Sequence, residues 1–186
     1  RSGRTDKGVD LLRGLVQAHP TDAMLRYRFA EALVSAARFS EAITELRVVV
    51  STDRKQVQPQ RLLGALLFQR GEFENALNVY RALTELRPRS SEFVVSLAKC
   101  HISIGRPLAA RGVVLDANTR GITSESMKLT LADACFIANR LDEAQSTLES
   151  EHWPKLEADR VALLAKVFER QRQYDQAIAT ANTAVQ

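Results

Sequence analysis

The chain has 186 residues, of which 45% are hydrophobic and 26% are charged, a composition typical of folded globular proteins. None of its apolar runs approaches the about 18–20 residues that a membrane-crossing helix needs, which excludes direct membrane insertion. The net charge of +4 is spread along the chain, so the composition argues against a nucleic-acid partner.

Glycine and proline are sparse, at 8 and 5 residues, which favours helix. Residues 6–19 carry Leu12, Leu15 and Val16 on one helical face and precede Pro20, which predicts a single helix there. Beyond it, apolar-periodic stretches alternate with short turns, which predicts helical hairpins. We expect the first helices of these hairpins over 23–36, 57–70, 91–104, 125–138 and 156–171, and the second helices over 39–52, 73–87, 107–119, 141–151 and 174–185.

An internal repeat sets the register of these hairpins. Small residues recur in the first helices at intervals of about 34 residues, and alanines recur in the second helices with the same period. The first series is Ala30, Gly64, Ala98, Ala132 and Ala165, and the second is Ala42, Ala76, Ala110, Ala144 and Ala177; the last step of both series is shorter by a single position. Small side chains let paired helices approach closely, and a larger one there costs typically ~1–3 kcal/mol.

The turn inside each hairpin follows the same period. Gly71, Gly105 and Asn139 lie one period apart, and Gly and Asn tolerate the left-handed backbone that ends a helix. Ala37 and Arg172 occupy the same slot in the outermost hairpins, where the residue type marks the turn less well.

This pattern resembles the tetratricopeptide repeat family, whose unit of about 34 residues is a helix–turn–helix. The second unit fits best, with Leu63, Gly64, Gly71, Phe73, Ala76, Tyr80 and Pro88 in the family's positions. The resemblance implies an all-α fold, a right-handed α-solenoid of antiparallel hairpins, as one array over 1–186. We divide the array into the second helix of a truncated repeat at 1–22 and five repeats at 23–56, 57–90, 91–124, 125–157 and 158–186.

The two ends of this array lack caps. A partner for the first helix would precede Arg1, and Ala177, Ala181, Ala184 and Val185 leave an apolar stripe on the last helix. Natural arrays usually cap such faces with polar helices. We therefore expect the chain to be a piece of a longer repeat protein whose uncapped ends offer surfaces for self-association.

The residues predict neither catalysis nor a bound metal or cofactor. His19, His101 and His152 lack a Cys or carboxylate partner at metal-ligand spacing, and the sequence holds no phosphate-binding or hydrolase motif. Cys100 and Cys135 fall on apolar helix faces, where we expect small buried side chains. The chain is thus expected to be no enzyme, and both a cytoplasmic and a periplasmic location are compatible with it.

In the family that the sequence resembles, the first helices line a concave groove. This implies a mixed aromatic and charged lining that binds a partner, with Arg61 and Lys99 close together at its middle. The expected groove residues are Tyr27, Glu31, Arg61, Ala65, Phe68, Lys99, Ile102, Asp133, Phe136 and Lys166, with Val34, Glu92, Leu129 and Arg170 on the same lining. Aromatic groups beside Arg are common in binding hot spots, whereas acidic groups among the aromatics argue against nucleic acid.

Chaperone-binding members of the family hold a C-terminal carboxylate with a clamp of Lys, Asn, Asn, Lys and Arg. The corresponding positions are Tyr27, Glu31, Leu62, Glu92 and Ser96, or, one unit later, Arg61, Ala65, Ser96, Ser126 and Thr130. Neither set holds the clamp, and the carboxylates of Glu31 and Glu92 would repel the ligand. We expect no binding of chaperone tails.

The leading hypothesis is a scaffold that binds a protein or peptide segment in the groove. Arg exceeds Lys by 20 to 6, a bias that fits a bacterial gene. Bacterial members of the family often assemble secretion, polysaccharide-export or envelope machinery, which the resemblance implies as one setting. A second hypothesis is a regulatory or substrate-docking module of an enzyme. A third is binding of polysaccharide or nucleic acid in the groove.

Overall fold

The computed structural model describes residues 2–150 and 153–183, and every regular element in these ranges is an α-helix. The expectations placed on His152, Ala184 and Val185 fall outside the described residues. The chain forms two compact units, Arg1–Leu86 and Arg87–Gln186.

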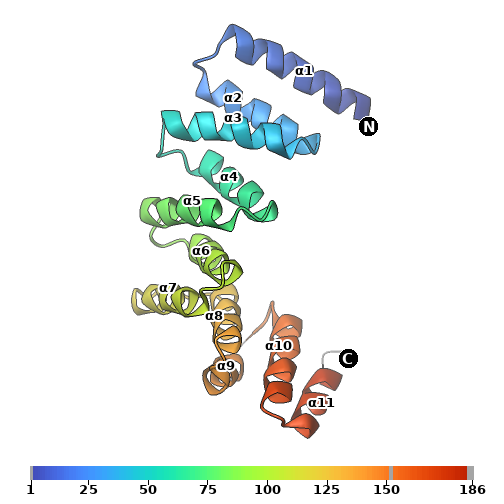
Figure 1. The fold of residues 1–186 in the computed structure, drawn as a ribbon, viewed down its shortest axis with the longest axis vertical. Helices are drawn as coiled ribbons and strands as arrows, with labels where there is room; N and C mark the ends of the chain where they lie inside the picture. Colours follow the sequence, from blue (N-terminus) through green and yellow to red (C-terminus); the bar gives the residue numbers. More distant parts are fainter. Residues whose placement is uncertain (1, 151–152, 184–186) are drawn as a thin grey trace. The chain divides into compact units, whose positions relative to one another are not determined.

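Unit 1 contains a single helix followed by two hairpins (Figure 1). The helices are α1 (Ser2–Ala18), α2 (Ala23–Ser35), α3 (Phe39–Thr52), α4 (Val57–Gln69) and α5 (Phe73–Leu86). Each helix packs against the next one along the chain.

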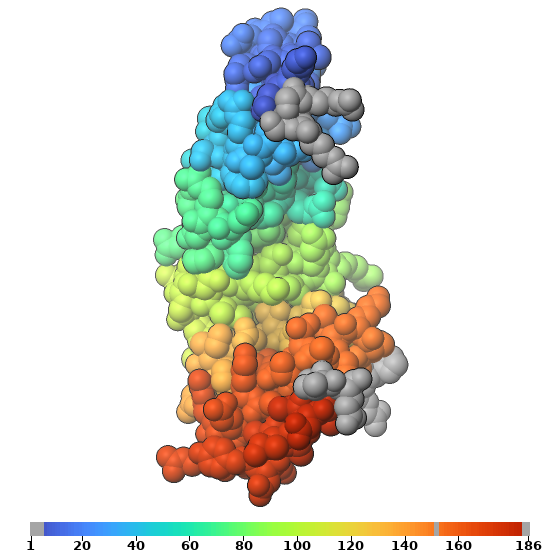
Figure 2. All heavy atoms as spheres, turned by 90° about the vertical axis from the view of Figure 1, so that its right-hand side faces the viewer, coloured from blue at the N-terminus to red at the C-terminus, as the bar shows by residue number. Residues whose placement is uncertain are grey.

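Unit 2 contains three further hairpins. Its helices are α6 (Ser91–Ser103), α7 (Pro107–Thr119), α8 (Glu125–Ile137), α9 (Leu141–Leu148), α10 (Glu157–Arg170) and α11 (Tyr174–Thr183). The first helices of these hairpins, α6, α8 and α10, also contact one another in sequence, α6 with α8 and α8 with α10. In the space-filling view the helices of each unit appear as successive bands in chain order (Figure 2).

The small residues of the repeat lie where helices cross. Ala30, Ala98 and Ala132 of the first-helix series are fully buried, and so is every second-helix alanine from Ala42 to Ala144. In the last hairpin the alanines at positions 165 and 177 are only half-buried. The packing of the repeat thus follows the register read from the sequence.

The core of unit 2 lies between the first and second helices. Val114, Met127, Leu148 and Val167 come from four different helices and are almost completely buried in one cluster. Burying a side chain of this size contributes about 1.5–3 kcal/mol relative to leaving it exposed. This cluster includes residues of α6, α8 and α10, and α8 contacts both of the other two helices.

Each of the five hairpin turns has a residue with left-handed backbone at the same position of the repeat. The backbone angle φ is 57° at Ala37, 79° at Gly71, 74° at Gly105, 57° at Asn139 and 62° at Arg172. In each turn two N–H groups donate to carbonyls of the preceding helix; in the first, Ala37 N donates to Val34 O at 2.9 Å and Arg38 N to Leu33 O at 2.8 Å. This is the Schellman arrangement. Ala37 and Arg172 therefore form the same turn as glycine, although their residue types do not mark it.

The predicted helix limits agree with the structure to within a residue or two at most ends. Two ends differ: α1 begins at Ser2 instead of residue 6, and α9 ends at Leu148 instead of residue 151. The early end of α9 has a local cause, because the Arg160 guanidinium donates to Leu148 O at 3.0 Å and the Trp153 indole donates to Ser150 O at 2.9 Å. These donors satisfy carbonyls that a continued helix would otherwise use.

Candidate functional site

Three of the expected groove residues share one position of the repeat in unit 2. Lys99 lies on α6, Asp133 on α8 and Lys166 on α10, each one repeat after the last. Since α8 contacts both α6 and α10, equal register positions come to lie side by side across the three helices. We call Lys99, Asp133 and Lys166 the charge row.

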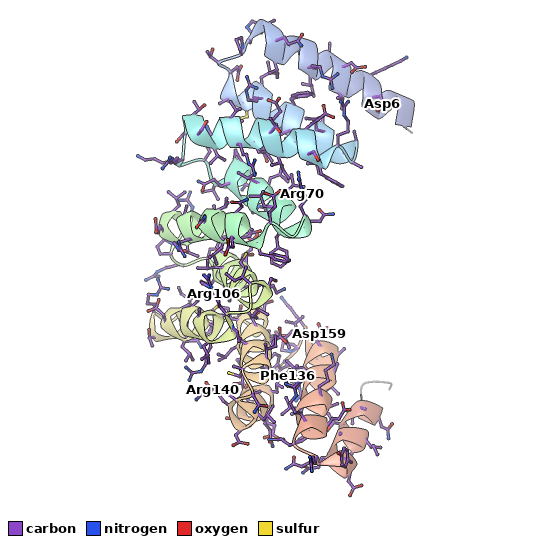
Figure 3. The ribbon with its side chains drawn as sticks, in the orientation of Figure 1. Asp6, Arg70, Arg106, Phe136, Arg140 and Asp159 are labelled. Carbon is purple, nitrogen blue, oxygen red and sulfur yellow. The ribbon has the colours of Figure 1, made fainter. Side chains whose placement is uncertain are left out.

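The charge row borders a cavity of about 470 Å³ between α6, α8 and α10. Its lining comprises Lys99, Ser126, Leu129, Thr130, Asp133, Leu156, Asp159, Ala162, Leu163 and Lys166. Figure 3 labels Asp159 near the start of α10, the helix that forms one wall. The cavity therefore combines an aliphatic floor with two ammonium groups and two carboxylates.

Among the four charged residues that line this cavity, Asp133 is the least exposed to solvent. Its side chain is half-buried and, within the described ranges, makes no hydrogen bond or direct ion pair. Burial raises the pKa of the Asp133 carboxyl, and the nearby ammonium groups of Lys166 and Lys99 offset part of that rise. A carboxylate removed from water without a donor is an acceptor that gains from a ligand N–H or ammonium group.

The walls of the cavity are held by hydrogen bonds that leave its charges free. Thr130 is buried, and its hydroxyl donates to Ser126 O at 2.7 Å, so it does not compete for Asp133. The Glu125 carboxylate accepts from the backbone N–H groups of Lys155 and Leu156 at 2.9 and 3.0 Å. These bonds tie the start of α10 to the start of α8, which holds two walls of the cavity together.

Phe136, which was expected on the groove lining, packs against a cationic side chain. The Arg170 guanidinium lies 4.0 Å from the centroid of the Phe136 ring and donates to Phe136 O at 3.1 Å. Figure 3 shows Phe136 on α8, on the side toward α10. Phe136 and Arg170 thus form a packed cation–π pair, and neither they nor the half-buried Ile102 line the cavity.

The expected residues of unit 1 form a separate group. Burial raises the pKa of the Tyr27 hydroxyl, and a hydrogen bond to Glu31 together with the charge of Glu31 raises it further. The positive charges of Arg28 and Arg61 oppose this rise in the pKa. Phe68 packs edge-to-face against Phe73 with ring centroids 5.1 Å apart.

Two further residues of this group, Arg61 and Ala65, differ from Tyr27 and Phe68 in their exposure to solvent. The side chains of Arg61 and Ala65 are exposed. The expected closeness of Arg61 and Lys99 stays a prediction, because these residues belong to different units.

Several cavity residues were not singled out from the sequence as groove residues. Ser126 and Asp159 share the register of Glu92, which was expected on the lining, and lie one and two repeats after it. That register was the available signal for them. Leu156 and Leu163 carried no such signal, because an aliphatic residue at either position is equally consistent with the core.

The described residues hold no cluster of three or more His, Cys, Asp or Glu side chains that could bind a metal ion. Cys100 and Cys135 are fully buried, and burial raises the pKa of each thiol to about 11. Such thiols carry little thiolate at neutral pH and are poor nucleophiles. In the described ranges no helix combines the length and the apolar character required to cross a membrane.

Comparison with sequence families finds two matches, and both are described as tetratricopeptide repeat. One covers residues 1–66 and the other covers residues 61–123. No curated protein matches the chain in sequence.

Comparison with solved structures finds helical-repeat proteins of low sequence identity. MamA from Desulfovibrio magneticus RS-1 aligns with a TM-score of 0.76 at 14% identity, covering 89% of this chain and 94% of that one. YrrB, described as a tetratricopeptide protein with an unusual peptide-binding site, gives a TM-score of 0.69 at 13% identity, covering 94% and 90%. PilF of Pseudomonas aeruginosa gives 0.68 at 16% identity, covering 98% and 82%. These similarities confirm the expected fold class, an all-α solenoid of antiparallel hairpins.

Proposed function

The chain belongs to the tetratricopeptide repeat family, and from that premise we propose that it is an interaction scaffold that binds an extended segment of another protein. The binding surface is the first-helix face of unit 2, where α6, α8 and α10 meet. The single observation that supports this location is the cavity of about 470 Å³ bordered by the charge row. The peptide-binding site for which YrrB is described supports a peptide as the ligand class.

The described contacts favour binding over catalysis at this face. The charged groups in the cavity are two ammonium groups and two carboxylates, and of its two hydroxyls the one on Thr130 donates to Ser126 O. Their side chains make no direct ion pair within the described part of the chain, so a ligand displaces no strong internal contact. Preformed sites of this kind gain affinity because little ordering is required on binding.

Selection from a displayed library of random peptides tests the proposal. Selected peptides are then measured against the wild type and against Lys99→Glu combined with Lys166→Glu. The control combines Lys7→Glu with Lys55→Glu, which makes the same charge change at exposed positions outside the cavity. The proposal predicts that the first variant loses binding and the control keeps it. Equal binding by both variants would place the binding surface elsewhere and overturn the proposal.

A second candidate function is self-association, which the exposed apolar side chains of α11 favour. Tyr174 and Ile178 on this helix are 58% and 62% exposed, and the described part of α11 packs chiefly against α10. Exposed apolar side chains in a row favour association. Sedimentation of the wild type and of Ile178→Glu tests it: a concentration-dependent oligomer that the variant abolishes supports the candidate, and a monomeric wild type overturns it.

A further inference from the structure

The charges of the cavity are arranged in an order that specifies the chemistry of the occupant. Across α6, α8 and α10 the charge row reads positive, negative, positive, at Lys99, Asp133 and Lys166. The charges of the two lysines act on the Asp133 carboxyl, and within the described residues neither lysine forms an ion pair with it, so each charge can pair with a ligand group. A ligand that complements this order must read negative, positive, negative.

The spacing of the helices sets the spacing of those ligand charges. Packed helices lie about 8–10 Å apart. An extended segment in the polyproline II conformation rises about 3.1 Å per residue with three residues per turn, so every third side chain points the same way and lies about 9 Å from the last. An extended segment lying across the three helices would therefore present matching charges at every third residue.

The cavity floor sets what lies between the charges. Leu129 of α8, Leu163 of α10 and Leu156 just before α10 line the same cavity as the charge row. Aliphatic side chains on the segment would be removed from water against this floor, at about 25 cal/mol per Å² of apolar surface buried. Asp159, on the same wall as Lys166, adds a second acceptor for a basic group.

Resting on the proposed function, we infer that the face of unit 2 recognises an extended peptide segment with an acidic, a basic and an acidic side chain at every third residue, separated by aliphatic residues. The two acidic groups pair with Lys99 and Lys166, and the basic group pairs with Asp133. Opposed charges at such a face contribute mainly to specificity, because a segment of the wrong charge order meets like charges at all three positions.

Synthetic peptides of defined charge order test this inference. The matching peptide carries Glu, Lys and Glu at every third position with Val and Leu between them. One control inverts the charges to Lys, Glu and Lys, and another keeps the composition of the matching peptide but clusters its charged residues at one end. Calorimetry on the whole chain is expected to give affinity for the matching peptide about tenfold above either control.

Charge reversal at the centre of the row gives the sharper result. Asp133→Lys is expected to weaken binding of the matching peptide at least about tenfold and to transfer preference to a peptide with Glu at all three positions. If Asp133→Lys does not fold by circular dichroism, Asp133→Asn replaces it, and the preference for the central Lys is expected to disappear. An unchanged preference in the folded variant overturns the inference.

The outcomes separate the inference from the proposed function. If library peptides bind this face but lack the charge order, the inference is wrong and the proposed function stands. The same holds if all three designed peptides bind equally and lose binding in Lys99→Glu combined with Lys166→Glu. If neither designed nor selected peptides bind, both are wrong. If free glutamate and free lysine bind as tightly as the matching peptide, the cavity takes a small zwitterionic ligand and the inference is wrong.

Discussion

A Cβ atom placed on Gly64 would lie 3.0 Å from Cζ of the Tyr80 ring, so α4 and α5 pack closely at a glycine where an added methyl group would require the ring to shift. Tyr80 is itself buried, with 6% of its surface exposed, and its ring has little freedom to move away. The small-residue series of the repeat is therefore a packing requirement at this crossing.

The first prediction concerns this crossing. Gly64→Ala gains about 1 kcal/mol of helix propensity. It also forces the Tyr80 ring to move, and overpacking of this kind costs about 1–3 kcal/mol. We expect a net loss of up to about 2 kcal/mol in the free energy of unfolding by urea. The control is Gly112→Ala on α7, where a Cβ atom meets nothing within 4 Å and a gain of about 1 kcal/mol is expected. Equal gains in both variants would contradict the packing account.

The second prediction concerns the turns. Ala37 has φ of 57°, and a side chain in this left-handed region costs roughly 1–2 kcal/mol. Replacing Ala37 with glycine removes this strain. Part of the gain in stability is offset, because glycine makes the unfolded chain more flexible. Ala37→Gly is expected to stabilise the protein by about 0.5–1 kcal/mol. Gly71→Ala at the equivalent turn is expected to destabilise it by a similar amount, and denaturant titration of both variants checks the opposite signs.

The third prediction concerns pH. Because burial raises the pKa of Asp133, its carboxyl binds a proton more tightly in the folded chain than in the unfolded chain. The folded state therefore loses stability as pH rises through the folded pKa. Asp133→Asn is expected to melt at a higher temperature than the wild type at neutral pH. The two are expected to melt alike below the unfolded pKa of about 3.9.

Glu143 provides the opposite case for that experiment. Burial opposes ionisation of its carboxyl, but hydrogen bonds and charges from Arg140 and Arg111 outweigh burial and lower its pKa. The bonds are 2.6 Å from Arg140 Nε and 2.7 Å from Arg111 Nε. This stabilisation is present above the unfolded pKa and is lost as pH falls through the folded pKa. Glu143→Gln is therefore expected to lower the melting temperature at neutral pH, and a shift of the same sign as Asp133→Asn would contradict both assignments.

The fourth prediction concerns the thiols. Cys100 and Cys135 are fully buried and have pKa values near 11, so a thiol reagent is expected to label them only when unit 2 opens. Labelling is expected to accelerate with urea in step with unfolding. Ser103→Cys, at an exposed position near the end of α6, supplies a thiol that reacts at once. Immediate reaction of the wild type in native buffer would show that the core of unit 2 is open.

The sequence predicted the register well because one spacing governs both buried series. The same spacing also identified Lys99, Asp133 and Lys166, which the structure brings to one cavity. Spacing cannot show which neighbour covers an aromatic ring. The pairing of Phe136 with Arg170 and of Phe68 with Phe73 depends on side-chain conformations that no periodicity records.

Other differences arise from contacts that are specific to one repeat. The end of α9 depends on the donors from Trp153 and Arg160, which have no counterpart elsewhere in the repeat pattern. The left-handed turns at Ala37 and Arg172 are imposed by the hairpin itself, because the two turn hydrogen bonds outweigh the cost of a side chain there.

The central claim is that a peptide segment binds the first-helix face of unit 2, and mapping amide shifts on the isotope-labelled chain tests it most directly. A library-selected peptide is titrated into the protein while the backbone N–H signals are followed by NMR. The account predicts that the largest shifts fall on α6, α8 and α10, at and around Lys99, Asp133 and Lys166. Shifts confined to the second helices α7 and α9, or to unit 1, would contradict it.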